Sequence, residues 1–300
     1  MSKIIPFPAL LPNLSLVHKI ICPPYDVIES EQAREFAKDN PYSLLHITKS
    51  EIDFPPNVYP YDDAIYEKAA RNLHRFKEQD YLFQDQPNLY IYRMIAGEWI
   101  QTGVVAGVSA SEYEQGLIKQ HEKTREEKVI DRTKHSLALK AHAEPVILVH
   151  KYNDAIREQV KVEESDALLY KVTDKLGVQH ILWRVSQPER LMELFAGLDA
   201  LYIADGHHRS ATGFRVQQEM SKTNPNHNGT EPYNFFPAVI FQETEVRVFE
   251  YNWVGPADKR PLSKITMADI IKLSDEGGIM PPKSTWFAPK LTSGLFLYPF

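Results

Sequence analysis

The stretch that organises this chain is residues 201–210, which read Leu201-Tyr202-Ile203-Ala204-Asp205-Gly206-His207-His208-Arg209-Ser210. Its first four residues are apolar and predict a short buried strand. Gly206 predicts a turn, because glycine adopts positive φ without steric cost. The chain is expected to re-enter a helix near Ser210. A strand, a glycine turn and a helix start together supply the N–H groups and the dipole that bind anions.

The polar side chains of this loop suit a phosphate ligand. The guanidinium of Arg209 can grip a phosphate with two parallel hydrogen bonds, and the two histidines add further donors. Asp205, at the carboxyl end of the strand, can hold a divalent metal or accept a hydroxyl proton. The alternative is a plain turn, in which Asp205 is a turn or cap residue and the histidines line it.

A second candidate lies at residues 118–125, which read Ile118-Lys119-Gln120-His121-Glu122-Lys123-Thr124-Arg125. Thr124 with Glu127 fits a capping box, so a helix is expected to begin near Arg125. Glu122 is then a candidate general base in the approach to that helix, and Arg125 a candidate phosphate ligand. The alternative, which the charged residues that follow favour, is a solvated helix with salt-bridged faces.

Two proline-rich segments form the third candidate: Pro23-Pro24-Tyr25-Asp26 and Pro281-Pro282-Lys283-Ser284-Thr285-Trp286. A rigid backbone with polar tips presents side chains to a substrate at low entropic cost. The same segments equally suit packing of Tyr25 and Trp286 against the core. Packing is the favoured interpretation, because aromatic side chains usually serve burial first.

The composition indicates a soluble globular protein. Hydrophobic residues make up 43% and charged residues 25% of the 300 residues, as is ordinary for globular chains. The net charge of −6 and the lack of a basic run argue against nucleic-acid binding. Cys22 is the single cysteine, which excludes an internal disulfide. No signal-peptide pattern and no apolar run of roughly 18 residues is present, so we expect a cytoplasmic protein without membrane association.

Residue periodicity predicts an α+β (mixed α/β) fold. Helices are expected at 31–39, 62–78, 188–198 and 267–275, and single strands at 146–150, 168–172 and 180–185. Two hairpins are expected, one joining 89–95 to 100–108 and the other joining 238–242 to 246–251. The tail at 280–287 is too rich in proline for regular structure. Residues 1–254 are predicted to form the main domain with the loop, and residues 255–300 a C-terminal segment packing on it.

Five motifs along the chain resemble one prokaryotic family. They are Pro23-Pro24-Tyr25-Asp26-Val27, Asn40-Pro41-Tyr42-Ser43, His121-Glu122-Lys123-Thr124-Arg125, Ile203-Ala204-Asp205-Gly206-His207-His208-Arg209-Ser210-Ala211 and Met280-Pro281-Pro282-Lys283-Ser284-Thr285-Trp286-Phe287. In this order they are similar to the bacterial and archaeal family called domain of unknown function 1015. Members usually carry a further stretch before the final helix, so this chain resembles a shortened form.

The loop from Asp205 to Arg209 also resembles, more distantly, the nucleotide-binding loop of ParB-like proteins, sulfiredoxins and ParB-like free serine kinases. This likeness implies a ParB-like core of mixed sheet and helices with additional hairpins. Sulfiredoxin needs a cysteine where His207 stands, and ParB proteins need DNA-binding helices and basic surfaces that this sequence lacks. Of these three relatives, only the free serine kinases therefore remain as a guide to the function.

Taken together, the loop and the likeness imply a small-molecule phosphotransferase. Its acceptor would be free L-serine or a similar hydroxyl compound, its donor a nucleotide or pyrophosphate, and its cofactor Mg²⁺. A non-enzymatic nucleotide sensor using the same loop, and a purely structural loop, stay open, as does the oligomeric state. The catalytic candidates are Asp205, His207 and Glu122, and Asp205 is also the candidate Mg²⁺ ligand. The candidate phosphate or nucleotide ligands are Gly206, His208, Arg209, Ser210 and Arg125. The candidate substrate contacts are Tyr25, Asp26, His121 and Lys283.

Overall fold

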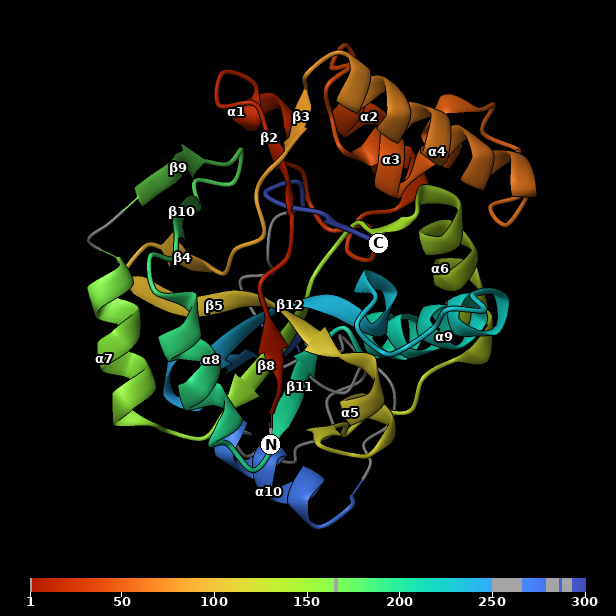
Figure 1. The fold of residues 1–300 in the computed structure, drawn as a ribbon. Helices are drawn as coiled ribbons and strands as arrows, with labels where there is room; N and C mark the ends of the chain where they lie inside the picture. Colours follow the sequence, from red (N-terminus) through yellow and green to blue (C-terminus); the bar gives the residue numbers. More distant parts are fainter. Residues whose placement is uncertain (1, 165–166, 250–265, 279–285, 288–292) are drawn as a thin grey trace, which may run out of the picture.

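Figure 1 shows the computed structural model of the chain, which describes residues 2–164, 167–249, 266–278, 286–287 and 293–300. Among these residues a nine-stranded sheet forms the centre of the fold. Its strands lie in the order β6 (Ile118–Lys119), β11 (Leu201–Asp205), β8 (Val146–His150), β12 (Phe235–Gln242), β5 (Trp99–Ser109), β4 (Tyr90–Ala96), β10 (Gln179–Arg184) and β9 (Ala167–Thr173), and β1 (Ile4–Ile5) pairs with β5.

The sheet is mixed. β8 runs parallel to β12, and β11 runs parallel to β6, whereas the other neighbouring pairs are antiparallel. Strands and helices alternate irregularly along the chain, which confirms the predicted α+β class. The predicted hairpin of 89–95 with 100–108 is confirmed as β4 and β5, joined across Gly97 at positive φ.

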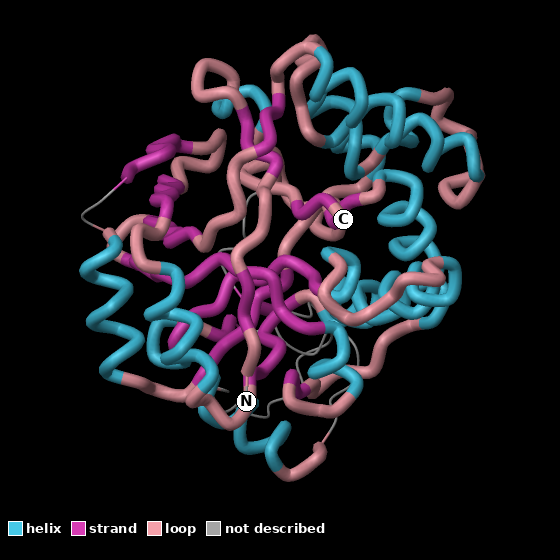
Figure 2. The backbone as a smooth tube through the Cα atoms, viewed as in Figure 1, coloured by secondary structure: helices cyan, strands magenta, loops and turns pink. Residues whose placement is uncertain are grey.

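One face of the sheet is covered by helices. Successive residues of β5 point to opposite faces, so Val104 and Ala106 belong to one core and Val105 to the other. On the first face these strand residues pack against apolar side chains of the surrounding helices. Figures 1 and 2 show how these helices lie against the sheet. These helices are α5 (Ala110–Glu114), α7 (Asp154–Glu163), α8 (Pro188–Ala196) and α9 (His207–Thr223).

The other face is covered by the two ends of the chain and by α10 (Met267–Asp275). Phe7 stacks on Tyr298, with ring centroids 4.8 Å apart, and Ile270 of α10 joins the same core. The predicted cap is confirmed, because the Thr266 hydroxyl accepts the N–H of Asp269 at 3.2 Å. Both faces are therefore buried, which is why the central strands are mostly apolar.

A separate helical layer packs beside the sheet around a third core. Helix α4 (Asp63–Glu78) shows how the sequence specifies this layer: as predicted, its buried stripe repeats at three- and four-residue steps, through Ile65, Ala69, Leu73 and Phe76. The other elements of the layer are α1 (Val17–Ile20), α2 (Ser30–Ala37), α3 (Leu45–Thr48), η1 (Ser50–Asp53) and α6 (Glu126–Leu139). Short pairings tie the layers together: β2 (Leu10–Pro12) with β3 (Leu82–Gln84), and β7 (Ala141–His142) with β15 (Tyr298–Pro299).

The second predicted hairpin is wrong. β13 (Val248–Phe249) pairs with β14 (Trp286–Phe287) and not with β12. The reason is that β12 has β5 on one side and β8 on the other, so neither of its edges can accept a further strand. The pairing also places regular structure at 286–287, where prolines predicted none, while residues 279–285 lie outside the described residues. In the described part of the chain, no helix is long and apolar enough to cross a membrane.

Candidate functional site

The predicted loop leaves the sheet at the carboxyl end of β11. The register with β8 shifts between Ile203 and Asp205, a bulge that turns the chain out of the sheet. Gly206 follows with φ of 93°, a conformation that disfavours any residue with a Cβ atom. A Cβ there would lie 3.1 Å from Val146 Cγ1 and 3.2 Å from Arg209 Nε. Glycine at this position is thus required by both the backbone turn and the close approach of Arg209.

Helix α9 begins at His207, three residues earlier than predicted, because the turn at Gly206 leads directly into it. Its first backbone hydrogen bond runs from Ser210 N–H to Gly206 O, at 2.8 Å. The N–H groups of the three preceding residues therefore lack an intrahelical acceptor. The N-cap residue Gly206 has no side chain that could cap them. The helix start carries the partial positive charge that an anion would complement.

Arg209 is held by a ring of oxygen atoms. Its guanidinium donates to Pro145 O and, at 3.2 Å, to Asp205 Oδ2, and it lies 3.6 Å from Asp26 Oδ2. Burial alone would lower the pKa of Arg209, but the carboxylates of Asp26, Asp205 and Glu144 raise it above its usual value. The side chain is 12% exposed, so its cation is fixed in place before any ligand binds.

Both histidines of the loop are neutral and act as hydrogen-bond acceptors. His207 Nε2 accepts the N–H of His121 at 3.4 Å, and His208 Nε2 accepts the N–H of Arg125 at 3.0 Å. Burial lowers the pKa of each ring below its usual value, and nearby positive or imidazole groups add to the effect. Since Nε2 accepts in both rings, the proton sits on Nδ1. His207 Nδ1 lies 3.7 Å from Glu122 Oε2, so this histidine lies next to the candidate base.

Helix α6 begins at Glu126 with Arg125 as its N-cap, which confirms the predicted start near Arg125. The predicted Thr124 capping box, however, does not form. In a capping box, the N–H of the cap residue is bonded by a side chain three positions on. Here that capping position is Arg125, and its N–H is bonded by His208 across the site. A tertiary contact has replaced the local cap and ties the two candidate segments together.

The loop opens into a cleft of about 360 Å³. Five of the predicted loop residues line it: Asp205, Gly206, His207, His208 and Arg209. The other two segments contribute Glu122, Arg125, Tyr25 and Asp26. Three regions far apart in the sequence therefore meet at one site. Such a volume suits a small-molecule ligand of nucleotide size or less.

Sequence reasoning missed one wall of this cleft, formed by α6. Lys128, Arg132 and His135 recur at steps of four and three residues, so they share one helix face, and all three line the cleft. The favoured interpretation of a solvated charged helix is wrong for this face, because Asp131 is buried and Arg132 is largely so. The spacing of the three basic or imidazole side chains was the signal that could have revealed it.

Tyr25 both packs against a neighbouring side chain and lines the cleft, so it combines the packing role and the contact role that the sequence left open. Its ring stacks over the guanidinium of Arg132, with Cζ 4.3 Å from the ring centroid, and it also lines the cleft. Burial raises the pKa of its hydroxyl, which stays protonated and able to donate. The segment is anchored by its own backbone, since Tyr25 N–H donates to Glu144 Oε1 at 3.0 Å.

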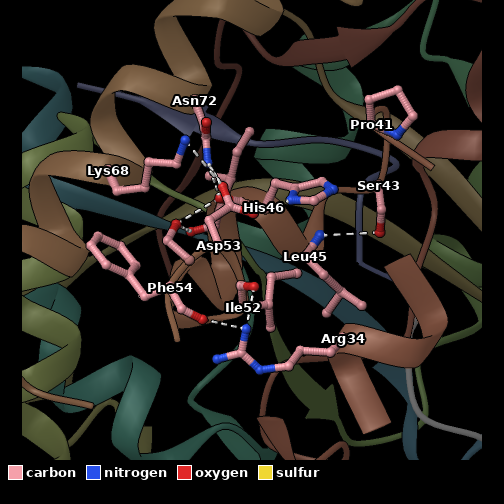
Figure 3. A network of polar contacts seen from close by, with 12 residues as sticks. Arg34, Pro41, Ser43, Leu45, His46, Ile52, Asp53, Phe54, Lys68 and Asn72 are labelled. Atoms are coloured by element: carbon pink, nitrogen blue, oxygen red, sulfur yellow. Dashed lines mark hydrogen bonds and ion pairs between the residues drawn. The ribbon is translucent and has the colours of Figure 1, made fainter. Parts of the chain in front are cut away.

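A polar network supports another part of the cleft wall, formed by α3 and η1 (Figure 3). Asp53 Oδ1 contacts His46 Nδ1 at 2.6 Å, and its Oδ2 accepts from Asn72 Nδ2 at 2.9 Å. Arg34 donates to the carbonyl oxygens of Phe54 and Glu51, at 2.6 and 2.7 Å. These contacts fix the short segment that carries Thr48, Lys49 and Glu51 into the cleft.

Stability should depend on the ionisation of Asp53. Burial opposes ionisation, but hydrogen bonds from His46 and Asn72 lower the pKa of Asp53 to about 2. A carboxyl with a depressed pKa stabilises the fold above its unfolded pKa and loses this contribution as pH falls through the folded value. Because the group is partly solvated, we expect an advantage of about 1 kcal/mol over Asp53→Asn. Urea unfolding should show this advantage above about pH 4 and its loss by about pH 2; a pH-independent difference would contradict the prediction.

Three predicted site residues are not placed in the cleft. Ser210 is fully buried on the inner side of α9, and its N–H is used by the helix. His121 is also buried, with its ring edge-on to that of His207 at 4.5 Å between centroids. Both side chains are buried in the core and lie behind the loop. Lys283 lies outside the described residues.

The carboxylates at the cleft suit a magnesium ion bound together with phosphate. Among the described residues no group of three or more His, Cys, Asp or Glu side chains could hold a metal alone. Mg²⁺, however, commonly takes one or two carboxylates and completes its shell with waters and substrate phosphates. Asp205 and Asp26 both line the cleft and are the carboxylates that would hold such an ion.

Fold and site thus define an α+β protein whose cleft forms where a strand of a mixed sheet turns, through a glycine, into a helix. Residues 4–269 match the family described as protein of unknown function (DUF1015), and the chain belongs to this family. This confirms the family predicted from the five motifs. No curated protein and no solved structure matches the chain. The more distant likeness to ParB-like proteins stays a prediction.

Proposed function

We propose that this protein is a small-molecule phosphotransferase that moves a phosphoryl group from a nucleotide or pyrophosphate to a hydroxyl compound such as free serine. The observation that carries the proposal is the turn at Gly206, which brings the N-terminal end of α9 and the buried cation of Arg209 to one cleft beside two carboxylates. Phosphoryl transfer needs little beyond positioning and positive charge, so such an arrangement suffices. The distant likeness to free serine kinases suggests the acceptor.

In this proposal the donor phosphates lie against the N–H groups at the start of α9, Arg209 and His208 Nδ1–H. The acceptor oxygen forms a bond to the terminal phosphorus as the bond from phosphorus to the leaving oxygen breaks. The hydroxyl proton passes to Glu122, which lies 3.7 Å from the ring of His207. Asp205 and Asp26 would hold Mg²⁺, which neutralises charge on the phosphates when bound.

The proposal predicts that phosphate-bearing donors stabilise the protein through Gly206. We would measure unfolding temperatures with ATP, ADP, CTP and pyrophosphate, each with and without Mg²⁺. A donor at about 100 times its dissociation constant should add roughly 2.7 kcal/mol to the native state. Gly206→Ala should abolish this gain, because the Cβ atom forces the turn and Arg209 apart. Turnover with serine and other hydroxyl compounds then separates an enzyme from a nucleotide sensor.

Gly177→Ala provides the matched control. Gly177 also has positive φ, 80°, but a Cβ there meets nothing within 4 Å. Both variants should lose roughly 1–2 kcal/mol from the strained backbone alone. Only Gly206→Ala should lose donor binding. Equal donor binding by both variants, or no stabilisation of the original protein by any donor, would remove the phosphotransferase from consideration.

A further inference from the structure

Behind the cleft lies a second, smaller cavity of about 30 Å³, which we call the inner chamber. The two spaces share Tyr25, Thr48, Arg132, His135 and Arg209 in their walls. The inner chamber therefore adjoins the cleft where the two guanidinium groups lie. Its size corresponds to about two water molecules, so it admits only a small group.

Three residues that line the inner chamber each carry a buried polar atom that has no hydrogen-bond partner in the described part of the chain: Glu144 Oε2, His142 Nε2 and Thr212 Oγ1. Their residues are 8%, 5% and 2% exposed. Buried polar atoms nearly always have partners, and an unpaired one lowers stability. Three of them around one cavity indicate a space built for an occupant that forms hydrogen bonds.

Their positions follow from the elements that carry them. Glu144 and His142 flank Ala143 just before β8, and Thr212 lies three residues after Arg209 on the same side of α9. Glu144 Oε1 is already bonded by Tyr25 N–H and by Ser293 Oγ at 2.6 Å, which leaves Oε2 for the chamber. Burial lowers the pKa of His142 to about 3, so its ring is neutral.

We infer that the inner chamber is a specificity subsite for a small hydrogen-donating group, such as an ammonium or a hydroxyl, carried by the acceptor compound. A carboxylate oxygen, a neutral imidazole and a hydroxyl can all accept hydrogen bonds. A phosphate group is too large for the space, and it would place further negative charge against Glu144. This inference rests on the proposed function, because the reacting hydroxyl of the same compound stays in the cleft beside Arg209.

Three probes of matched shape test the inference: ethanolamine, ethylene glycol and propanol. Each carries a hydroxymethyl group, and they differ in bearing an ammonium, a hydroxyl or a methyl group at the other end. We expect ethanolamine or ethylene glycol to bind at least about tenfold more tightly than propanol, measured by the rise of unfolding temperature with probe concentration. Preference for ethanolamine assigns the chamber to an ammonium, and preference for ethylene glycol assigns it to a hydroxyl.

Thr212→Val and Thr212→Ser form the variant pair. Valine keeps the shape and removes the hydroxyl, so the probe preference should fall several-fold, whereas serine should retain it. Because this hydroxyl has no partner among the described residues, Thr212→Val should unfold no more easily than the original protein. Glu144→Gln keeps Oε1 as an acceptor and removes the charge. This variant should weaken the binding of ethanolamine more than the binding of ethylene glycol.

Equal affinity for the three probes, binding of none of them, or an undiminished preference in Thr212→Val would overturn the subsite. So would a crystal structure with ordered water alone in the chamber at saturating ethanolamine and ethylene glycol. The donor experiment on Gly206→Ala keeps the two proposals apart. Donor stabilisation without probe preference leaves the phosphotransferase standing and removes only the subsite.

Discussion

Replacing Arg209 with alanine is expected to destabilise the fold and to remove phosphate binding at once. The guanidinium is largely buried and faces Asp205 and Asp26 at 3.2 and 3.6 Å, with Glu144 close enough to raise its pKa. Without it, these carboxyl groups lose their common cation. Removing one partner of a buried ion pair costs about 3–5 kcal/mol, because the remaining charge stays desolvated. Urea unfolding of Arg209→Ala should show a loss of this size.

Arg209→Lys separates the two effects. Lysine keeps the positive charge among the carboxylates, so most of the lost stability should return. It cannot form the forked pair of hydrogen bonds, so donor affinity should remain weak. Titration of both variants with pyrophosphate, alongside their unfolding curves, checks the prediction. If Arg209→Ala unfolds like the original protein, the guanidinium is not the cation that neutralises these carboxylates.

The second large effect is expected at Gly213, where α9 meets the sheet. A Cβ atom there would lie 2.6 Å from Phe236 Cδ1 and 2.7 Å from Cγ, closer than side chains tolerate. Gly213→Val should therefore push α9 away from β12. We expect a loss of about 3 kcal/mol in the free energy of unfolding, because overpacking outweighs the gain in helix propensity of about 0.4 kcal/mol. Donor binding should weaken as well, since the same helix carries Arg209 and His208.

Two comparisons make this prediction specific. Gln218→Val places the same residue on the exposed side of α9 and should cost only a few tenths of a kcal/mol. Combining Gly213→Val with Phe236→Ala should cost less than the sum of the two single changes, since the smaller side chain makes room. Additive costs would show that the two residues do not compete for space.

Local signals were enough for most elements and for the position of the loop. The stripe of Ile65, Ala69, Leu73 and Phe76 predicted α4, and Thr266 predicted the start of α10. Gly206 predicted the turn from strand to helix. Each of these depends on residues a few positions apart, so periodicity and backbone preference decide it.

Partners distant in the sequence could not be predicted in this way. The capping residue of α6 depended on His208, which lies 83 residues away. The partner of β13 depended on β12 having both edges paired already. Arg132 looked like one of many surface charges, and its burial against Tyr25 became visible only in the fold.

The sequence by itself therefore determined the family, the α+β class and the turn at Gly206, because these follow from short-range preferences and from motifs in a fixed order. Only the tertiary structure decided what surrounds that turn. It brought Asp26, Glu144 and Arg132 to Arg209, and it left three buried polar atoms of the described residues unpaired beside them. The reason is physical: burial and pairing are properties of neighbours in space, and a sheet whose adjacent strands lie far apart in the chain sets those neighbours.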